Sequence, residues 1–234
     1  MKKMVKRHLK RLTIPNSWKV QKKTNKFIAR PLPGAHNFSL GMPIIVILRD
    51  LLKLANTRRE VRYILNNQDI LIDNIKRKDE HFIAGFMDTL SIPLTKKFFR
   101  ILINKSGELS LKPAKESEIN IKPCKIIGKT LLKNKKIQIN LEDSRNIIVD
   151  KGEYKTGDSL LIELPSQKIK EHIKLEKGAV IFLTGGHHVG ETGKIVDIKD
   201  DRVVYKLKSG EQYESLKIYA FVVGKEKPSI ELEE

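Results

Sequence analysis

Short runs of alternating polar and apolar residues, separated by turn-forming residues, make up most of the chain from about residue 97 onward. "KKFFRILIN" and "ELSLKP" flank Ser106-Gly107, and "CKIIGKTLLKNKKIQINLEDSRNIIVD" and "YKTGDSLLIELPSQKIKEHIKL" follow with further turn residues. A period of two predicts half-buried strands, and turn residues this closely spaced separate short strands. The pattern favours a small β-barrel or sandwich in the middle of the chain. Acidic and basic residues are mixed there, which indicates a scaffold rather than a binding face.

A second set of strands is predicted between about residues 175 and 224. "GAVIFLTGG", "ETGKIVDIKD", "DRVVYKLK" and "EQYESLKIYAFVVG" are joined by tight turns at Asp200-Asp201 and Ser209-Gly210. About fifty residues of this kind are typical of a small SH3-like barrel. The chain then ends in "EKPSIELEE", an acidic tail without a core pattern.

Helical spacing is confined to the part of the chain that precedes these strands. Apolar residues recur at helical intervals over 44–52, after a proline that suits a first helical turn. Asn56 or Thr57 is predicted to cap a second helix, and "DILIDN" then alternates as a strand before a turn at Asp73-Asn74. Three arginines share the exposed side of the second helix, where they form either a platform for a phosphate backbone or an ordinary solvated face: Arg58, Arg59 and Arg62.

The first 48 residues contain no aspartate or glutamate, yet lysines and arginines crowd the first thirty. Prolines interrupt this stretch and it has little apolar periodicity, so it predicts an arm that becomes ordered on a polyanion. The alternative is a solvated disordered tail. Trp18, the only tryptophan, either anchors the arm to a domain or stacks on a base.

The net charge of the chain indicates an anionic partner. Lysine and arginine total 46 and aspartate and glutamate 28, which gives +18 and an isoelectric point near 9.8. Because such an excess destabilises a compact state by self-repulsion, it favours a role in binding nucleic acid or an acidic membrane surface. No segment is long and apolar enough to span a bilayer, and a single cysteine, Cys124, excludes an internal disulfide and favours a reducing compartment.

The stretch "LTGGHHVGETGKIVDI" combines four glycines with two adjacent histidines. It does not match a P-loop, because Gly193-Lys194 is followed by Ile195 rather than Ser or Thr. A metal site is disfavoured, because adjacent histidines on a strand would point to opposite faces and Cys124 is far away in the sequence. A catalytic site is disfavoured as well, because no Ser or Cys nucleophile lies near His188 and Glu191. A turn that offers backbone N–H groups, imidazoles and a lysine suits phosphate or ribose contact. The alternative is a loop that only needs positive φ angles, which glycine supplies.

This stretch resembles a KOW motif, and further stretches resemble a known family. "RHLKRLTIPNSWKV", "ARPLPGAHNFSLGMPIIVILRDLLKLA", "REVRYIL" and "FMDTLSI" are similar, in the same order, to the archaeal and eukaryotic small-subunit ribosomal protein S-four-e. The resemblance covers essentially the whole chain. It implies a structural protein that binds small-subunit ribosomal RNA, without catalysis. Two departures are His187-His188, where the family often has a small or basic residue followed by asparagine, and the short acidic C-terminus, which looks archaeal.

Together these observations predict an α+β multidomain chain with a basic N-terminal extension, a small helical RNA-binding domain, a central small β-barrel or sandwich and a C-terminal SH3-like KOW β-barrel. The resemblance implies that the helical domain is shared with bacterial small-subunit protein four and with pseudouridine synthases. The expected boundaries are 1–42 for the extension, 43–105 for the helical domain, 106–173 for the central domain, 174–225 for the barrel and 226–234 for the tail.

The expected partners are small-subunit ribosomal RNA and neighbouring ribosomal proteins in the cytoplasm, with no cofactor, metal, membrane, small-molecule substrate or homo-oligomer. Two alternatives remain open at this point: an RNA-modifying enzyme, for which Asp88 would be the nearest candidate but reads more simply as a turn or cap residue, and a free RNA chaperone. The candidate RNA-binding residues are Lys3, Lys6, Arg7, His8, Lys10, Arg11, Trp18, Lys19, Lys22, Lys23, Lys26, Arg30, His36, Arg49, Arg58, Arg59, Arg62, Lys76, Arg77, Gly185, Gly186, His187, His188, Gly190 and Lys194.

Overall fold

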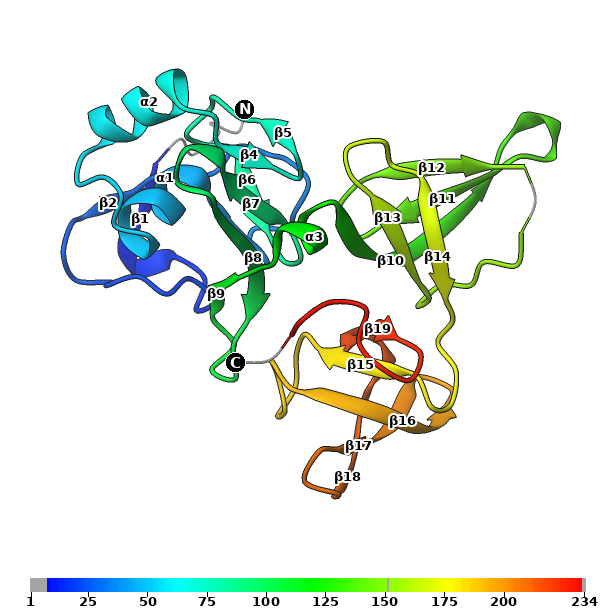
Figure 1. The fold of residues 1–234 in the computed structure, drawn as a ribbon. Helices are drawn as coiled ribbons and strands as arrows, with labels where there is room; N and C mark the ends of the chain where they lie inside the picture. The colour runs from blue at the N-terminus through cyan, green and yellow to red at the C-terminus, as the bar shows by residue number, and fades with distance from the viewer. Residues whose placement is uncertain (1–7, 151, 233–234) are drawn as a thin grey trace, which may run out of the picture.

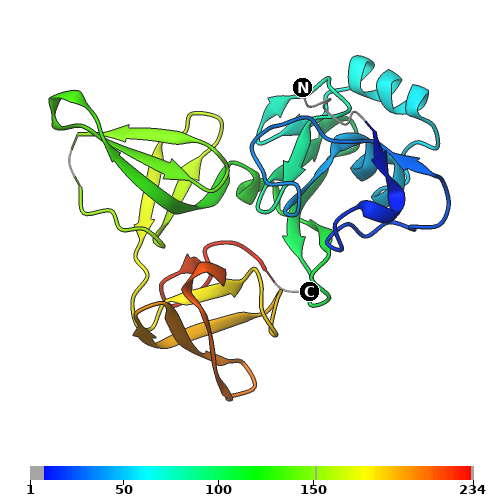
Figure 2. The same cartoon turned by 180° about the vertical axis from the view of Figure 1, so that it is seen from behind.

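Three units, each built around a five-stranded antiparallel sheet, form a triangle in the computed structural model, which describes residues 8–150 and 152–232 (Figure 1). Figure 2 shows the same arrangement from behind, so each unit lies beside the other two. We call them the first domain (8–119), the central domain (120–173) and the C-terminal domain (174–232).

The first domain contains one regular helix and a sheet of order β5-β4-β7-β8-β9. Thr57 caps α2 (Arg58–Asn67) as predicted: its hydroxyl accepts from the Glu60 N–H at 3.3 Å, and the Glu60 carboxylate accepts from the Asn56 N–H at 2.7 Å. The remaining elements are α1 (Ile44–Val46), a π turn (Ile47–Leu51), β4 (Leu71–Ile72), β5 (Ile75–Lys76), β6 (Ile83–Gly85), β7 (Thr89–Ile92), a 3-10 turn (Pro93–Thr95), β8 (Lys97–Ile103), β9 (Leu109–Pro113) and α3 (Glu116–Ile119).

Two expectations for this domain need correction. It is not mainly helical, because only α2 extends over more than two turns and most of its core lies on the sheet. The expected boundary between 105 and 106 falls inside the β8–β9 hairpin, where Ile103 pairs with Leu109. A hairpin turn joins two strands of one sheet, so β9 stays with the first domain.

The described part of the basic arm, residues 8–42, packs on the rest of the first domain. It forms β1 (Leu9–Lys10), a 3-10 turn (Arg11–Thr13), β2 (Phe27–Ile28) and β3 (Gly41–Pro43), and β3 pairs with β6. Ile14 and Ile28 are 5% and 7% exposed and belong to the core of the domain. The prediction of an arm that is ordered only on a polyanion is therefore wrong for 8–42. Lys3, Lys6 and Arg7 lie outside the described residues.

The central domain has the sheet order β12-β11-β10-β13-β14. Its core includes Cys124, Ile126, Ile139, Leu160 and Ile162, which occupy alternate positions of their strands as the sequence predicts. The strands are β10 (Ile121–Leu131), β11 (Ile137–Leu141), β12 (Asn146–Val149), β13 (Ser159–Glu163) and β14 (Ile169–Ile173), with a 3-10 turn (Lys133–Lys135) between β10 and β11.

The C-terminal domain has the sheet order β18-β17-β16-β15-β19, with the five strands and turns that the sequence predicts. Ile181 and Leu183 face its own core, whereas the intervening Phe182 faces the first domain, where it and Phe221 pack on Phe86 at centroid distances of 5.5 and 5.2 Å. The strands are β15 (Val180–Leu183), β16 (Thr192–Lys199), β17 (Arg202–Leu207), β18 (Gln212–Leu216) and β19 (Ala220–Gly224), with a 3-10 turn (Lys217–Tyr219).

The acidic tail was expected to lack core contacts, but its two apolar residues are buried. Ile230 and Leu232 are 2% and 5% exposed and join the core of the first domain, and Lys115 forms an ion pair with Glu231. The tail therefore crosses from the C-terminal domain to the first domain.

A buried lysine joins the central and C-terminal domains. The Lys125 ammonium donates to the carbonyls of Ile218 and Ala220 at 2.7 and 2.8 Å, and to that of Lys217 at 3.3 Å. These carbonyls end the 3-10 turn before β19, where a cation is favourable.

Candidate nucleic-acid interface

The arm presents most of its predicted basic residues to solvent, but not all of them. Arg11 is 4% exposed and its guanidinium donates to the Gln21 carbonyl at 2.7 Å. Trp18 is 1% exposed and its indole N–H donates to the Gly41 carbonyl at 2.9 Å. Neither can contact RNA from this position, so Trp18 anchors the arm. The exposed candidates are His8, Lys10, Lys19, Lys22, Lys23, Lys26 and Arg30.

The arginines of α2 are held in place by a buried carboxylate. The guanidinium groups of Arg58 and Arg62 both bond Glu80 Oε1, at 2.5 and 2.8 Å. Burial opposes ionisation of Glu80, but these hydrogen bonds outweigh it and lower the pKa of its carboxyl. The side chains of Arg58 and Arg62 are still 53% and 58% exposed, and Arg59 beside them is exposed. One negative charge therefore orients two arginines and leaves the face positive.

Four further candidates have partners within the first domain. His36 Nε2 lies 2.8 Å from the buried Asp88 carboxylate, which removes it from any RNA contact. Arg49 pairs with its neighbour Asp50 at 2.8 Å. Lys76 pairs with Asp69 while staying exposed, and Arg77 is half-buried over the Phe82 ring, 4.2 Å from its centroid.

The glycine-rich turn lies between β15 and β16, and its two histidines have different environments. His187 and Gly186 are exposed. His188 is half-buried against the Tyr213 ring, with centroids 4.1 Å apart, and its Nδ1 lies 3.2 Å from Glu191. Lys194, on β16, is exposed. Among the described residues no group of three or more potential ligands could hold a metal ion.

The glycines of this turn are explained by packing and backbone conformation. A Cβ on Gly185 would lie 2.6 Å from the Tyr219 ring, and Gly186 has φ +88°. Gly190 has φ +80°, and a Cβ there would lie 2.5 Å from the backbone of Asn104 in the β8–β9 turn. The turn is therefore fitted against the first domain, and Gly190 is a domain contact.

We expect Gly190→Ala to destabilise the chain more than Gly210→Ala. Both glycines have left-handed φ angles, so both substitutions bring backbone strain of about 1–3 kcal/mol. The nearest atom to a Cβ on Gly210 is the mobile end of Lys206 at 3.9 Å, whereas Gly190 would meet fixed backbone. The overlap adds about 1–3 kcal/mol. Urea unfolding of the two variants measures the difference, and equal losses would contradict the packing role.

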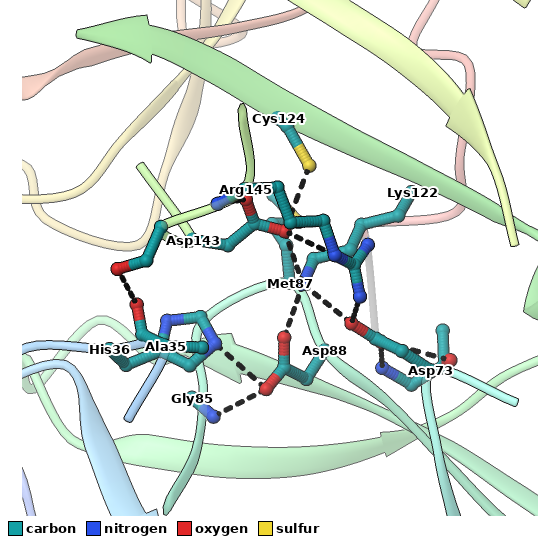
Figure 3. Close-up of polar contacts among 12 residues, drawn as sticks. Ala35, His36, Asp73, Gly85, Met87, Asp88, Lys122, Cys124, Asp143 and Arg145 are labelled. Carbon is teal, nitrogen blue, oxygen red and sulfur yellow. Dashed lines mark hydrogen bonds and ion pairs between the residues drawn. The ribbon is translucent and has the colours of Figure 1, made fainter. Parts of the chain in front are cut away.

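A buried charge cluster joins the first and central domains, and sequence reasoning missed it (Figure 3). Lys122 of β10 lies 2.8 Å from Asp73 and 3.1 Å from Asp143, and it also pairs with Asp88. Arg145 pairs with Asp73 at 2.7 Å. Asp88 also accepts the Gly85 N–H at 2.9 Å, as a turn residue would. Residues so far apart in sequence give no local signal of their convergence.

This cluster is structural. Burial opposes ionisation of Asp88 and Asp143, but Lys122, with His36 at Asp88 and Arg145 at Asp143, outweighs it and lowers the pKa of both carboxyls. A buried carboxylate paired with cations is a poor nucleophile or base, so Asp88 does not support the alternative of an RNA-modifying enzyme. Burial raises the pKa of the Cys124 thiol, which makes it unreactive.

Comparison with known proteins places the chain in one family. The model of ribosomal family S4e matches residues 95–169, and that of the RS4NT domain matches residues 3–39. The small ribosomal subunit protein eS4 of Methanocaldococcus jannaschii is 42% identical over 244 residues, covering 99% of each chain. That of Methanosphaera stadtmanae is 44% identical over 232 residues, covering 97% of this chain and 95% of the relative.

A solved structure agrees with these relatives. The crystal structure of the 30S ribosomal protein S4e from Thermoplasma acidophilum matches with a TM-score of 0.69 and 29% identity, over 80% of this chain and 96% of that one. None of the helices in the described residues is long and apolar enough to cross a membrane. On sequence identity over nearly its whole length, the chain belongs to the ribosomal S4e family, whose members are structural, non-enzymatic ribosomal proteins.

Proposed function

We propose that this chain is a structural component of the small ribosomal subunit in the cytoplasm, and that it binds ribosomal RNA without a cofactor. The observation that carries the proposal is the set of exposed lysines on the arm, a stretch whose sequence contains no acidic residue up to Leu48. Lysines of this kind bind phosphates and release counterions, which gives affinity without sequence recognition. The names of the relatives support the small subunit as the partner.

The folded arm changes how this binding works. Because residues 8–42 already pack on the first domain, the exposed lysines stand on a fixed scaffold, and less conformational entropy is lost on binding. Arg58, Arg59 and Arg62 add a second positive face, and His187 with Lys194 a third. Three faces on one triangular body suit recognition of RNA shape rather than of base sequence.

The test is co-sedimentation of the tagged protein with small subunits on sucrose gradients at low and high salt. Stoichiometric migration that resists moderate salt is expected, because many phosphate contacts form at once. Migration at the top of the gradient at all salt concentrations would overturn the proposal.

A charge variant tests the role of the arm. Replacing Lys19, Lys22, Lys23 and Lys26 with glutamine should lower the slope of log affinity against log salt by about 3, at roughly 0.7 per phosphate contact. The measurement is a filter-binding series with small-subunit RNA. An unchanged slope would show that the arm makes no phosphate contact. The control replaces four lysines that already pair with Glu163, Glu176, Asp197 and Glu171: Lys170, Lys174, Lys177 and Lys225.

A further inference from the structure

A hairpin of the central domain extends beyond the domain's core. β10 and β11 continue to pair through Lys129–Ile139, Thr130–Gln138 and Leu131–Ile137, and the Leu132 N–H bonds the Lys136 carbonyl at 2.8 Å. Figures 1 and 2 show its tip at the outer end of the central domain, away from both other domains. Residues 127–136, which we call the finger, are thus presented to a partner rather than packed on the chain itself.

The charge of the finger is positive and largely unpaired. Residues 126–141 contain no aspartate or glutamate but include Lys129, Lys133, Lys135 and Lys136, all exposed. Lys136 pairs with Asp150 at 3.3 Å, and Asp150 is itself 82% exposed. Within the part of the chain that the structure describes, no carboxylate forms an ion pair with the other three lysines. Lysines packed this closely repel one another unless an anion binds between them.

The finger also exposes apolar side chains among the lysines. Leu131 and Ile127 are 79% and 60% exposed, and Leu132 is 36% exposed. Burying an exposed leucine against a partner removes apolar surface from water and so stabilises a complex. Ribose rings and the faces of unstacked bases offer apolar surface beside phosphates, and inserted aliphatic side chains are known at such surfaces. A protein partner is less favoured, because lysine is depleted in protein–protein interfaces.

We propose that the finger is a separate RNA-binding element of the central domain, in which Lys129, Lys133 and Lys135 contact phosphates and Leu131 and Leu132 pack on ribose or base surfaces. This inference rests on the proposed function, because its partner is RNA of the same subunit. It assigns RNA contact to a domain whose mixed charge had indicated only a scaffold.

Lysine acetylation tests the proposal without a mutation. The full chain is treated with an acetylating reagent, once as the free protein and once within assembled small subunits. Mass spectrometry then measures the extent of acetylation at each lysine. Lys129, Lys133 and Lys135 should lose reactivity on assembly and regain it after ribonuclease treatment. Lys168, an exposed lysine of the β13–β14 turn, is the internal reference. Full reactivity of the three finger lysines in assembled subunits would overturn the proposal, as would protection that survives ribonuclease, which would mean a protein partner.

Two variants separate the parts of the finger. In the first variant, glutamine replaces Lys129, Lys133 and Lys135. The slope of log affinity for small-subunit RNA against log salt should become less steep by about 2, at roughly 0.7 per phosphate contact. Leu131→Ser with Leu132→Ser should weaken affinity without changing the slope. In the control variant, glutamine replaces three lysines that already form ion pairs: Lys170, Lys174 and Lys177. The finger proposal fails, and the ribosomal role stands, if the unsubstituted chain co-sediments with subunits and the finger variants bind small-subunit RNA with the same affinity and the same salt dependence. If the unsubstituted chain does not co-sediment, the ribosomal role itself fails.

Discussion

Lys122→Met is expected to destabilise the chain by about 3–5 kcal/mol, the cost of removing one partner from a buried ion pair. The Lys122 side chain is 2% exposed and touches Asp73, Asp88 and Asp143. Burial opposes its charge, but the three carboxylates outweigh burial and raise the pKa of Lys122, so it stays protonated. Methionine would leave three buried carboxylates to share Arg145 and His36. Urea unfolding followed by circular dichroism measures the loss.

The pH dependence of that loss identifies charge as its cause. Asp88 and Asp143 have pKa values below their ordinary range in the folded chain. Their contribution is therefore present above the ordinary aspartate pKa of about 4 and is lost as the pH falls below it. In the Lys122→Met variant the carboxylates no longer gain from the lysine, so the difference in stability between the two proteins should stay nearly constant from pH 7 to about pH 4 and narrow below it.

Two outcomes would contradict this account. A loss of stability below about 1 kcal/mol would mean that the Lys122 ion pairs contribute no more than ion pairs on a protein surface do. A difference that stays constant as the pH falls below about 4 would attribute the loss to packing. Lys168→Met is the matched control, because Lys168 is an exposed lysine of the same domain and its replacement should leave the unfolding midpoint unchanged.

Sequence signals that act over a few residues predicted the local structure correctly. The cap at Thr57, the turn at Asp73-Asn74 and the β8–β9 hairpin are all present. The strands of the C-terminal domain also appear where alternation indicates them. These features depend on the spacing of apolar residues, on turn-forming residues and on helix caps, and each of these is set by residues that are close together in the sequence.

The arrangement of the domains could not be predicted, because it depends on contacts between distant residues. The acidic tail has too few apolar residues to show a period, yet Ile230 and Leu232 are buried, since the first domain supplies the matching surface. Phe182 belongs to a strand of alternating residues, but the alternation does not predict that the first domain covers the outer face of that strand. The charge cluster likewise joins Lys122 of β10 to Asp73, which lies 49 residues away along the chain.

The candidate RNA-binding residues stay predictions, and their burial could not be predicted for the same reason. Composition says that positive charge is present, but burial decides which charges can reach a partner. Lys19, Lys22 and Lys23 are exposed, whereas Arg11 and His36 have partners inside the first domain. The lysines of the finger lie in a region of mixed overall charge, so composition does not single them out, although the acid-free run 126–141 is visible in the sequence.

Trp18→Ala is expected to destabilise the chain by about 3–5 kcal/mol and to release the arm. The indole is buried next to Phe38, with ring centroids 5.4 Å apart, and it donates to the Gly41 carbonyl. Next to it, the Leu109 N–H donates to the Ser17 carbonyl at 2.6 Å, which ties the arm to β9. Limited proteolysis should leave residues 8–42 intact in the unsubstituted protein and cut them quickly in the variant.

Two controls separate anchoring from general instability. Phe27→Ala removes an aromatic ring of the arm that is 49% exposed, so it should cost much less. Trp18→Phe keeps most of the buried surface but loses the indole N–H, which leaves the Gly41 carbonyl without this donor and should cost about 1–3 kcal/mol. Rapid cleavage of the arm in the unsubstituted protein would contradict the packed arm. Its lysines would then have to be ordered by RNA, and the entropy of ordering would oppose binding.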